Sequence, residues 1–345
     1  MSQIDSPPLA NHGRAPPKRR ARPAPARMIR DIPAFPNWAR IGDAARDPGD
    51  VGFFAGAALA VFDGALRSGA DGGEPLFSGV LRQRLALRCA AAAARLLRLR
   101  EDEAALRDAE HLAVGPDPGP AGRLYRLWRD MASGRIAFSH AGFAEARALL
   151  SMPQGPDDTL PADFFSQPGL RAGDPLSLAA QAANRLAAAL DGAPRAEADI
   201  LSYWAADHAL AAAFGWARPV PLIAAQIHTP ALRSRFNGRR PTPRDPEWPQ
   251  ALAVAYALAA QEAHRSAREL TRGADKLLCV APKLRAKGAA KAVALLLADD
   301  CASAARAARA TGLSDRAARR FFDRLMELGA VRELTGRPNF RLYGL

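Results

Sequence analysis

The sequence predicts a mainly α-helical protein: an alanine-rich helical bundle body that ends in a C-terminal winged helix-turn-helix with a small β-hairpin wing. Hydrophobic residues make up 49% of the chain and aromatic residues only 7%, which favours helices packed through Ala and Leu over aromatic-rich strands. Apolar residues recur at helical spacing between turns rich in Pro and Gly. Only the end of the chain changes to the alternating pattern of short strands.

The 345 residues are enough for two or three domains of roughly 100 to 200 residues each. We expect a disordered basic tail over residues 1–33, because its Pro-, Arg- and Ala-rich composition offers little to bury. A helical domain should follow over 34–155, and a second helical segment over 156–282 should pack on it. The winged helix-turn-helix should occupy 283–345.

Helix signals in the body are local and clear. The run from Leu81 to Val114 has helical apolar spacing, and the acidic residues after Arg100 predict that a second helix begins there. The Pro- and Gly-rich loop over 115–122 must end it. The order Asp174-Pro175, an N-cap followed by proline, predicts another helix start.

Neither a membrane span nor a disulfide framework is expected. The most apolar run, "VGFFAGAALAVFDGAL" from Val51, is short for a bilayer and contains Asp63, so it predicts a core helix. Cys89, Cys279 and Cys301 are odd in number and far apart, which is typical of reduced thiols. We therefore expect a cytoplasmic protein.

The excess positive charge lies at the two ends of the chain, whose formal net charge is +13. Residues 1–30 hold seven Lys or Arg against one Asp, and the segment from Lys283 holds thirteen basic against six acidic residues, so 31–282 is balanced. Basic segments attract polyanions such as nucleic acids. A solvated tail without a binding role is the alternative for the N-terminus.

The C-terminal segment contains three predicted helices. The first should end near Asp299, the second lies between a predicted N-cap at Ser303 and Gly312, and the third runs from the N-cap Ser314 to Gly329. The short turn around Gly312 makes the second and third helices a helix-turn-helix.

The third of these helices has an apolar face and an arginine face. Its apolar residues follow steps of four, four and three: they are Ala317, Phe321, Leu325 and Leu328. The arginines on the other side predict a recognition helix, because Arg contacts both phosphates and guanine edges in the major groove. These arginines are Arg316, Arg319, Arg320 and Arg324. The alternative is a solvated face balanced by neighbouring acids.

A hairpin wing should close the chain. "VREL" and "FRLY" flank the turn-forming "TGRPN". Arg337 at the tip and Arg341 on the second strand are the predicted wing contacts to DNA. Phe340 and Leu342 should share the buried face of that strand.

Three lysines lead into this module. Lys283, Lys287 and Lys291 are each four residues apart, so they form one stripe of phosphate contacts if the segment is helical. The alternative interpretation is again a solvated face.

Five segments together resemble a known bacterial family. They are "RLALRCAAAAARLLRLREDEAALRDAEHL", "GPDPGPAGRLYRLWR", "VPLIAAQIHTPALRS", "VAPKLRAKGAAKAV" and "LSDRAARRFFDRLMELGAVRELTGRPNFRLYGL". They cover most of 38–345 and resemble the domain of unknown function 1403 family, a resemblance that implies no particular activity.

The last segment, over Glu327–Tyr343, is also similar to the winged helix that ends many Fic-type proteins, with its pattern "ELGxxRELTGRxxxRLY". The Fic catalytic His and its Gly-Asn-Gly-Arg phosphate loop have no counterpart, since "FNGRR" at Phe236 lacks the preceding His and the first glycine. The likeness therefore implies a winged helix without nucleotide transfer.

The sequence contains no clear catalytic constellation. The six histidines are scattered, and none pairs with another at the i, i+4 spacing of a shared metal. "AEH" at Ala109 and "ADH" at Ala206 place a carboxylate beside His, but structural roles are expected for both. We expect no enzyme activity, no cofactor and no metal.

A loop in the second helical segment is the remaining candidate site. "IAAQIHTPALRSRFNGRRPTPRD" collects basic residues where a helix gives way to a loop, which predicts an anion or partner site. The site residues are Arg233, Arg235, Arg239 and Arg240, and the same stretch carries Gln226 and His228. An exposed basic loop is the alternative.

These features predict a DNA-binding regulatory or replicon-associated protein that contacts duplex DNA through its winged helix. The body would bind a protein partner or form a homodimer. The alternative is an interaction scaffold whose winged helix docks onto a protein. A degenerate Fic-like enzyme is a third hypothesis, supported only by the C-terminal likeness.

Overall fold

A computed structural model describes residues 29–42, 47–113, 115–153, 160, 164–165, 174–234, 237–284, 288–337 and 339–345 of the chain. Eleven α-helices and a small three-stranded sheet are found among them. Most of the predicted basic tail lies outside these residues, as do the predicted site residues Arg235 and Lys287.

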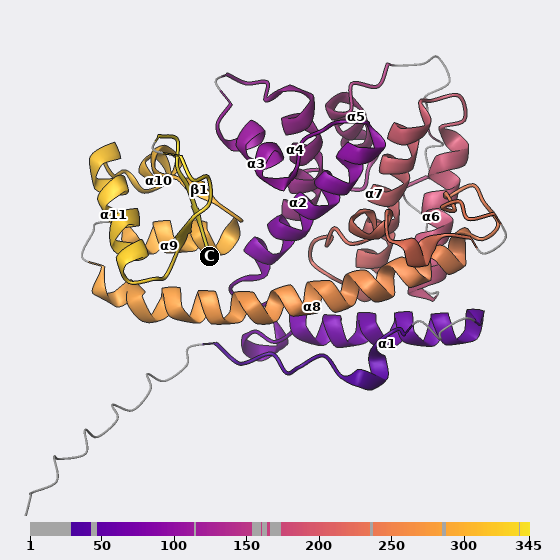
Figure 1. Cartoon of the computed structure of the whole chain (residues 1–345), viewed down its shortest axis with the longest axis horizontal. Coiled ribbons are helices and arrows are strands. Elements are labelled where there is room, and N and C mark those ends of the chain that lie inside the picture. Colours follow the sequence, from indigo (N-terminus) through magenta and orange to yellow (C-terminus); the bar gives the residue numbers. More distant parts are fainter. Residues whose placement is uncertain are drawn as a thin grey trace, which may run out of the picture.

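Eight helices form the body (Figure 1). They are α1 (Pro48–Leu66), α2 (Ser78–Leu96), α3 (Glu103–His111), α4 (Gly119–Ser133), α5 (His140–Leu149), α6 (Pro175–Ala189), α7 (Arg195–Phe214) and α8 (Trp248–Val280). Short 3-10 turns join α7 to α8, at η4 (Ile223–Gln226) and η5 (Pro230–Leu232). Mainly helical architecture is confirmed, including the helix break near Arg100.

The C-terminal module begins beyond a last 3-10 turn, η6 (Ala281–Lys283). Its elements are α9 (Ala289–Ala298), β1 (Ala302–Ser303), α10 (Ala304–Thr311), α11 (Asp315–Glu327), β2 (Arg332–Glu333) and β3 (Leu342–Gly344). The strands form an antiparallel sheet in the order β1-β3-β2, with Ala302 opposite Tyr343 and Arg332 opposite Gly344.

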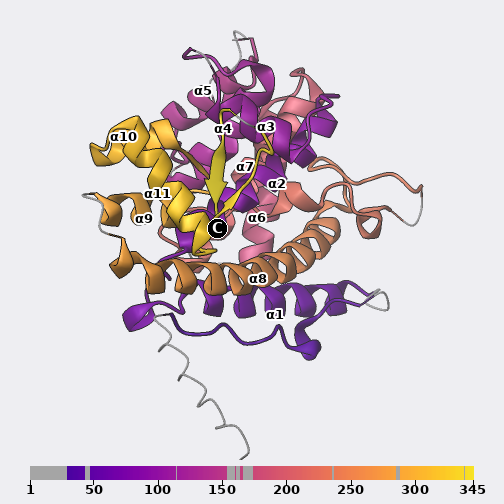
Figure 2. The ribbon, with the colours of Figure 1, turned by 60° about the vertical axis from the view of Figure 1, so that its left-hand side comes forward.

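The long helix α8 organises the molecule. Its 33 residues span about 50 Å at the helical rise. Figure 1 shows α1 along one side of α8, α2 to α7 on the other, and the C-terminal module at the end where α8 finishes; Figure 2 shows the same arrangement from another side. Alanines such as Ala260 and Ala263 are fully buried on α8 and let the neighbouring helices approach closely.

Side-chain caps fix several helix starts, as the sequence predicts. The Asp174 carboxylate accepts hydrogen bonds from two backbone N–H groups at the start of α6. The Ser303 hydroxyl accepts from Arg306 N at the start of α10, and the Ser314 hydroxyl accepts from Ala317 N at the start of α11. Such caps satisfy N–H groups that the helix itself leaves unpaired.

The chain packs on the body earlier than predicted. Ile29, Ile32 and Phe35 are buried, and the Ile29 N–H donates to the Asp275 carboxylate on α8. An unpacked tail reaching residue 33 is therefore wrong for residues 29–33. The sequence of this segment contains isolated large apolar residues rather than a pattern, so its burial depends on the surface that α8 offers.

By length and composition, one described helix could cross a membrane: the window Gly49–Leu66 of α1 has a mean hydropathy of 1.4. In the structure α1 lies along α8 and buries Leu59 and Phe62. Asp63 accepts hydrogen bonds from Arg67 and from the Trp216 indole N–H, at 2.7 Å. These contacts make α1 a packing helix of the body.

Asp207 on α7 is a fully buried carboxylate that orders the chain leading into η4. It accepts hydrogen bonds from Leu222 N at 2.9 Å, from Ile223 N at 3.3 Å and from the Tyr256 hydroxyl at 3.0 Å. Burial raises the pKa of Asp207 to about 7, although these hydrogen bonds act in the opposite direction.

This pKa makes stability depend on pH. The folded protein keeps the Asp207 proton up to a higher pH than the unfolded chain does, so the free energy of unfolding falls as pH rises from about 4 to about 7 and then levels off. We expect Asp207→Asn to remove up to about 4 kcal/mol of that fall. Urea unfolding at several pH values checks this: the other titrating groups are common to both proteins, so parallel curves would contradict it.

Candidate functional site

The arginine face of α11 points away from the protein. Arg316, Arg319, Arg320 and Arg324 are all exposed. The opposite side of the helix is held by Phe321, Phe322 and Leu325, which are buried. The Phe322 ring stacks on Tyr343 of β3, with 4.3 Å between ring centroids and 5° between planes. The sheet therefore fixes how α11 presents its arginines.

Three of these four arginines form no ion pair with the described residues. Arg324 forms an ion pair with Glu327 at 2.8 Å. Within the part of the chain that the structure describes, Arg316, Arg319 and Arg320 form no ion pair and donate no hydrogen bond. These guanidinium groups are available to an anion, although the exposed acids Asp315, Asp323 and Glu327 lie on the same helix.

The predicted wing residue Arg337 is 57% exposed, but its charge is already paired. Its guanidinium pairs with Asp108 of α3 at 2.8 Å, and nearby Arg107 donates to the Leu334 carbonyl oxygen at 3.3 Å. The β2–β3 connection thus contacts α3 of the body. Arg341 stays exposed and its Nε donates to the Arg337 carbonyl oxygen.

The predicted burial of Phe340 is also wrong. Phe340 is 73% exposed and has a φ of 57°, the left-handed region that bulky residues rarely adopt. Leu342 of β3 is buried as predicted, and its neighbour Tyr343 is buried as well. The strand begins only after the turn residues, so the alternation predicted from Phe340 onward does not start there.

The lysines do not form a helical stripe. Helix α8 ends at Val280, and Gly288 has a φ of 90° before α9 begins. Lys283 lies in η6 and Lys291 in the first turn of α9, and both are exposed. The spacing of four was therefore misleading, because the segment between them is not one helix.

A buried ion cluster joins the module to the body. Arg129 of α4 makes a two-pronged contact with Asp299, at 2.7 and 2.8 Å, and donates to Asp300 at 3.1 Å. Arg306 of α10 pairs with Asp299 Oδ2 at 2.6 Å, the oxygen that also accepts from Arg129 Nη2. Burial opposes ionisation of Asp299, but Arg129 outweighs it and holds the pKa of that carboxyl well below its usual value.

One group near this cluster has the donor types of a metal site. Ligand atoms of His111, Asp300 and Cys301 lie within 4.8 Å of one another. Arg129 already donates to Asp300 and lies 3.1 Å from His111 Nε2, so a cation stands where a metal would bind. Burial also raises the pKa of Cys301 well above its usual value, so a metal would have to displace the thiol proton as well as the guanidinium. These residues therefore do not fit a metal.

The two carboxylate–histidine pairs of the sequence, Glu110-His111 and Asp207-His208, make structural contacts with other residues. His208 stacks on Phe138 and contacts Trp204, and burial lowers its pKa to about 3. Asp207 bonds to backbone and to Tyr256, as described above. The Glu110 carboxylate pairs with Arg126 at 3.0 Å.

Three of the predicted anion-site residues line one cavity of about 470 Å³. Arg233, Arg239 and Arg240 surround it, together with His228 of the same predicted stretch and with residues that the sequence did not single out. These additional residues are Arg195, Ile227, Thr229, Gly238 and Thr242. Arg195 is the first residue of α7, so a helix more than thirty positions away in sequence contributes to the site.

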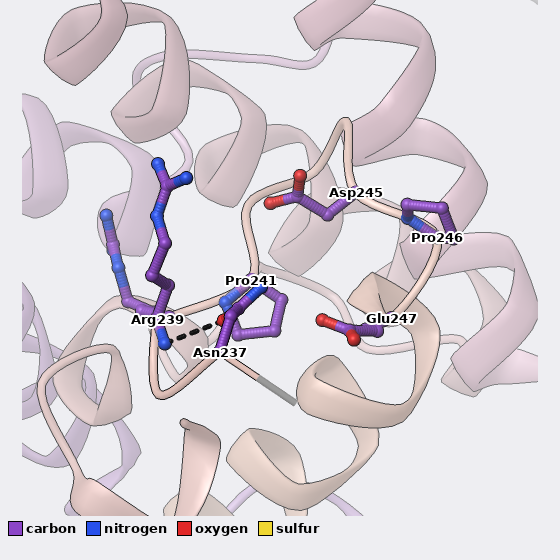
Figure 3. Close-up of a pocket in the computed structure, with 7 residues that line it drawn as sticks. Asn237, Arg239, Pro241, Asp245, Pro246 and Glu247 are labelled. Carbon is purple, nitrogen blue, oxygen red and sulfur yellow. Dashed lines mark hydrogen bonds between the residues drawn. The ribbon is translucent and has the colours of Figure 1, made fainter. Parts of the chain in front are cut away.

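A smaller cavity of about 220 Å³ lies beside it on the same loop and shares Arg239 and Arg240. Figure 3 shows Arg239, Asp245 and Glu247 around it, with the Arg239 N–H bonded to the Asn237 side chain at 2.8 Å. Burial favours a raised pKa for Asp245, but hydrogen bonds from Thr242 lower it overall. Carboxylates therefore line the smaller cavity, whereas the residues that line the larger one include no acid.

The fold and these surfaces define a helical protein with a basic helix-and-sheet module at its C-terminus. Residues 25–345 match the family model described as protein of unknown function (DUF1403), and the chain belongs to that family. No curated protein matches the chain.

Proposed function

We propose that the C-terminal module is a winged helix-turn-helix through which this protein binds duplex DNA as a regulatory or replicon-associated protein. The element order α9-β1-α10-α11-β2-β3 and the sheet order β1-β3-β2 support this assignment. The turn between α10 and α11 is short, with Gly312 at a φ of 75°, as a helix-turn-helix requires.

The observation that carries the proposal is the unpaired arginine face of α11. An α-helix fits the major groove of B-DNA, and Arg there reads guanine and neutralises phosphates. Arg316, Arg319 and Arg320 are exposed on one side of a helix whose other side is fixed by Phe322 against β3. A rigid, exposed, positively charged helix is what such binding needs.

The wing has a different role in this proposal. Because Arg337 pairs with Asp108 and Arg107 bonds to Leu334, the wing attaches the module to the body and leaves base contacts to α11. Arg341 remains available for a phosphate.

The test is a salt series with the full chain, because the module is joined to the body by buried contacts. We expect fluorescence anisotropy to show duplex binding whose log K falls against log salt with a slope of about −3 or steeper, as three or more neutralised phosphates require. Negligible or salt-independent binding would contradict the proposal. A salt-insensitive partner recovered by pull-down would then favour protein docking through the same helix.

A further inference from the structure

We propose that the cavity lined by Arg195, Arg233, Arg239 and Arg240 is a binding site for a phosphate-bearing ligand with at least two negative charges. Its position distinguishes it from the α11 surface. The loop that forms it precedes α8, whereas the C-terminal module follows α8, and the two lie toward opposite ends of that helix in Figures 1 and 2. The helix spans about 50 Å, so the site is separate from the face proposed to bind DNA.

The first argument is the positive charge of two arginines that line the cavity. Arg233 and Arg239 are exposed, and among the described residues neither side chain forms an ion pair or donates a hydrogen bond. Both line the 470 Å³ cavity. Guanidinium groups collected around a concavity repel one another, and a multiply charged anion is the ligand that relieves this repulsion.

The second argument is that buried groups orient the wall of the site. The Arg240 guanidinium donates hydrogen bonds to the Tyr203 hydroxyl at 2.9 Å and to the Asp199 carboxylate at 3.5 Å. Tyr203 is fully buried and Asp199 is 6% exposed. Burial raises the pKa of Asp199 to about 6, even though Arg240 and Arg195 oppose this shift. Arg240 is therefore held in place before any ligand arrives, as a preorganised site requires.

The third argument is the chemistry of the remaining lining. Arg195 donates to the Thr242 hydroxyl at 3.5 Å, which brings the start of α7 to the cavity. His228 donates from Nε2 to the Ala92 carbonyl at 2.9 Å, so its ring is fixed. Burial lowers the pKa of His228, the charges of Arg95 and Arg240 act in the same direction, and the hydrogen bond to Ala92 opposes them, so the imidazole adds little to the positive charge.

Size and polarity select the ligand class. A cavity of about 470 Å³ lies in the range of small-molecule sites, roughly 300–1,000 Å³. The arginine fork fits both carboxylate and phosphate, but a phosphate has more acceptor oxygens than a carboxylate and can bind several arginines at once. A phosphorylated small molecule and a phosphate of a nucleic-acid backbone share this chemistry.

Isothermal titration of the full chain with inorganic pyrophosphate tests the site. We expect saturable binding at one site and at least about tenfold weaker binding to Arg233→Ala/Arg239→Ala. Neither residue packs in the core, so the fold should be unchanged. The matched control is Arg265→Ala/Arg272→Ala, which removes two exposed α8 arginines outside the cavity and should bind like the wild type. No binding at millimolar pyrophosphate, or equal loss in both double variants, would overturn the proposal.

Competition with a short duplex identifies the source of the phosphate. If duplex displaces pyrophosphate even from a variant with a reversed α11 face, the site takes a nucleic-acid phosphate. If the two bind independently, the ligand is a free phosphorylated molecule, and both outcomes support the site. Pyrophosphate binding does not depend on DNA binding, so failure of the proposed function leaves this result interpretable.

Discussion

Reversing the charge of Arg319 and Arg320 to Glu should abolish binding of the full chain to duplex DNA, with at least about a hundredfold loss of affinity in anisotropy titrations. Both residues are exposed on α11, and neither forms an ion pair with another residue that the structure describes. The reversal replaces two phosphate-neutralising charges by two that repel phosphate. Because neither side chain contributes to the Phe322–Tyr343 packing, the thermal melt should stay unchanged.

A matched reversal separates local contact from overall charge. Arg265→Glu/Arg272→Glu changes the formal charge of +13 by the same amount on exposed positions of α8. We expect it to lower the affinity only slightly, because long-range attraction is screened beyond about 10 Å in 0.1 M salt. Retained binding in the α11 variant, or an equal loss in both, would contradict a recognition role for α11.

Local signals made much of the fold predictable. The caps at Asp174, Ser303 and Ser314 depend only on a side chain and the backbone two or three residues ahead, so sequence alone identifies them. The buried face of α11 follows in the same way from helical periodicity, which places Phe321 and Leu325 on one side. The exposed arginines of α11 could be predicted for this reason.

Contacts between distant segments could not be predicted. Arg129 meets Asp299 across 170 positions, and Arg337 meets Asp108 only because the module leans on α3. Nothing local distinguishes these charged residues from solvated ones. The arginine cavity combines a predictable part and an unpredictable part. The loop arginines stand out in the sequence, whereas Arg195 joins them only through the packing of α7.

Regular spacing in the sequence gave wrong predictions at two places where the backbone leaves the regular element. The lysines at intervals of four suggested one stripe, but the positive φ of Gly288 separates η6 from α9. Phe340 sits in the turn before β3, at a positive φ, so strand alternation does not apply to it. In both places the periodic pattern continued past the point where the regular element stopped.

The second large effect is expected at the cluster that joins the module to the body. Arg129→Met should lower the free energy of unfolding by about 3–5 kcal/mol, because it leaves the buried carboxylates of Asp299 and Asp300 without their main partner. Asp299 and Asp300 are 4% and 3% exposed, so water cannot replace the guanidinium. Urea unfolding of the two proteins measures the difference.

Two further variants show whether the loss comes from unpaired charge. Arg265→Met removes a pair with Glu262 whose arginine is 67% exposed, and exposed pairs of this kind contribute less than about 1 kcal/mol. Combining Arg129→Met with Asp299→Asn and Asp300→Asn should recover part of the lost stability, since the unpaired buried charges are then gone and only packing and hydrogen bonds differ.

If Arg129→Met lowered the free energy of unfolding no more than Arg265→Met does, the cluster would not be what attaches the module. If the combined variant were less stable still, each carboxylate would have to be supported by groups other than Arg129, of which Arg306 is the nearest to Asp299, at 2.6 Å.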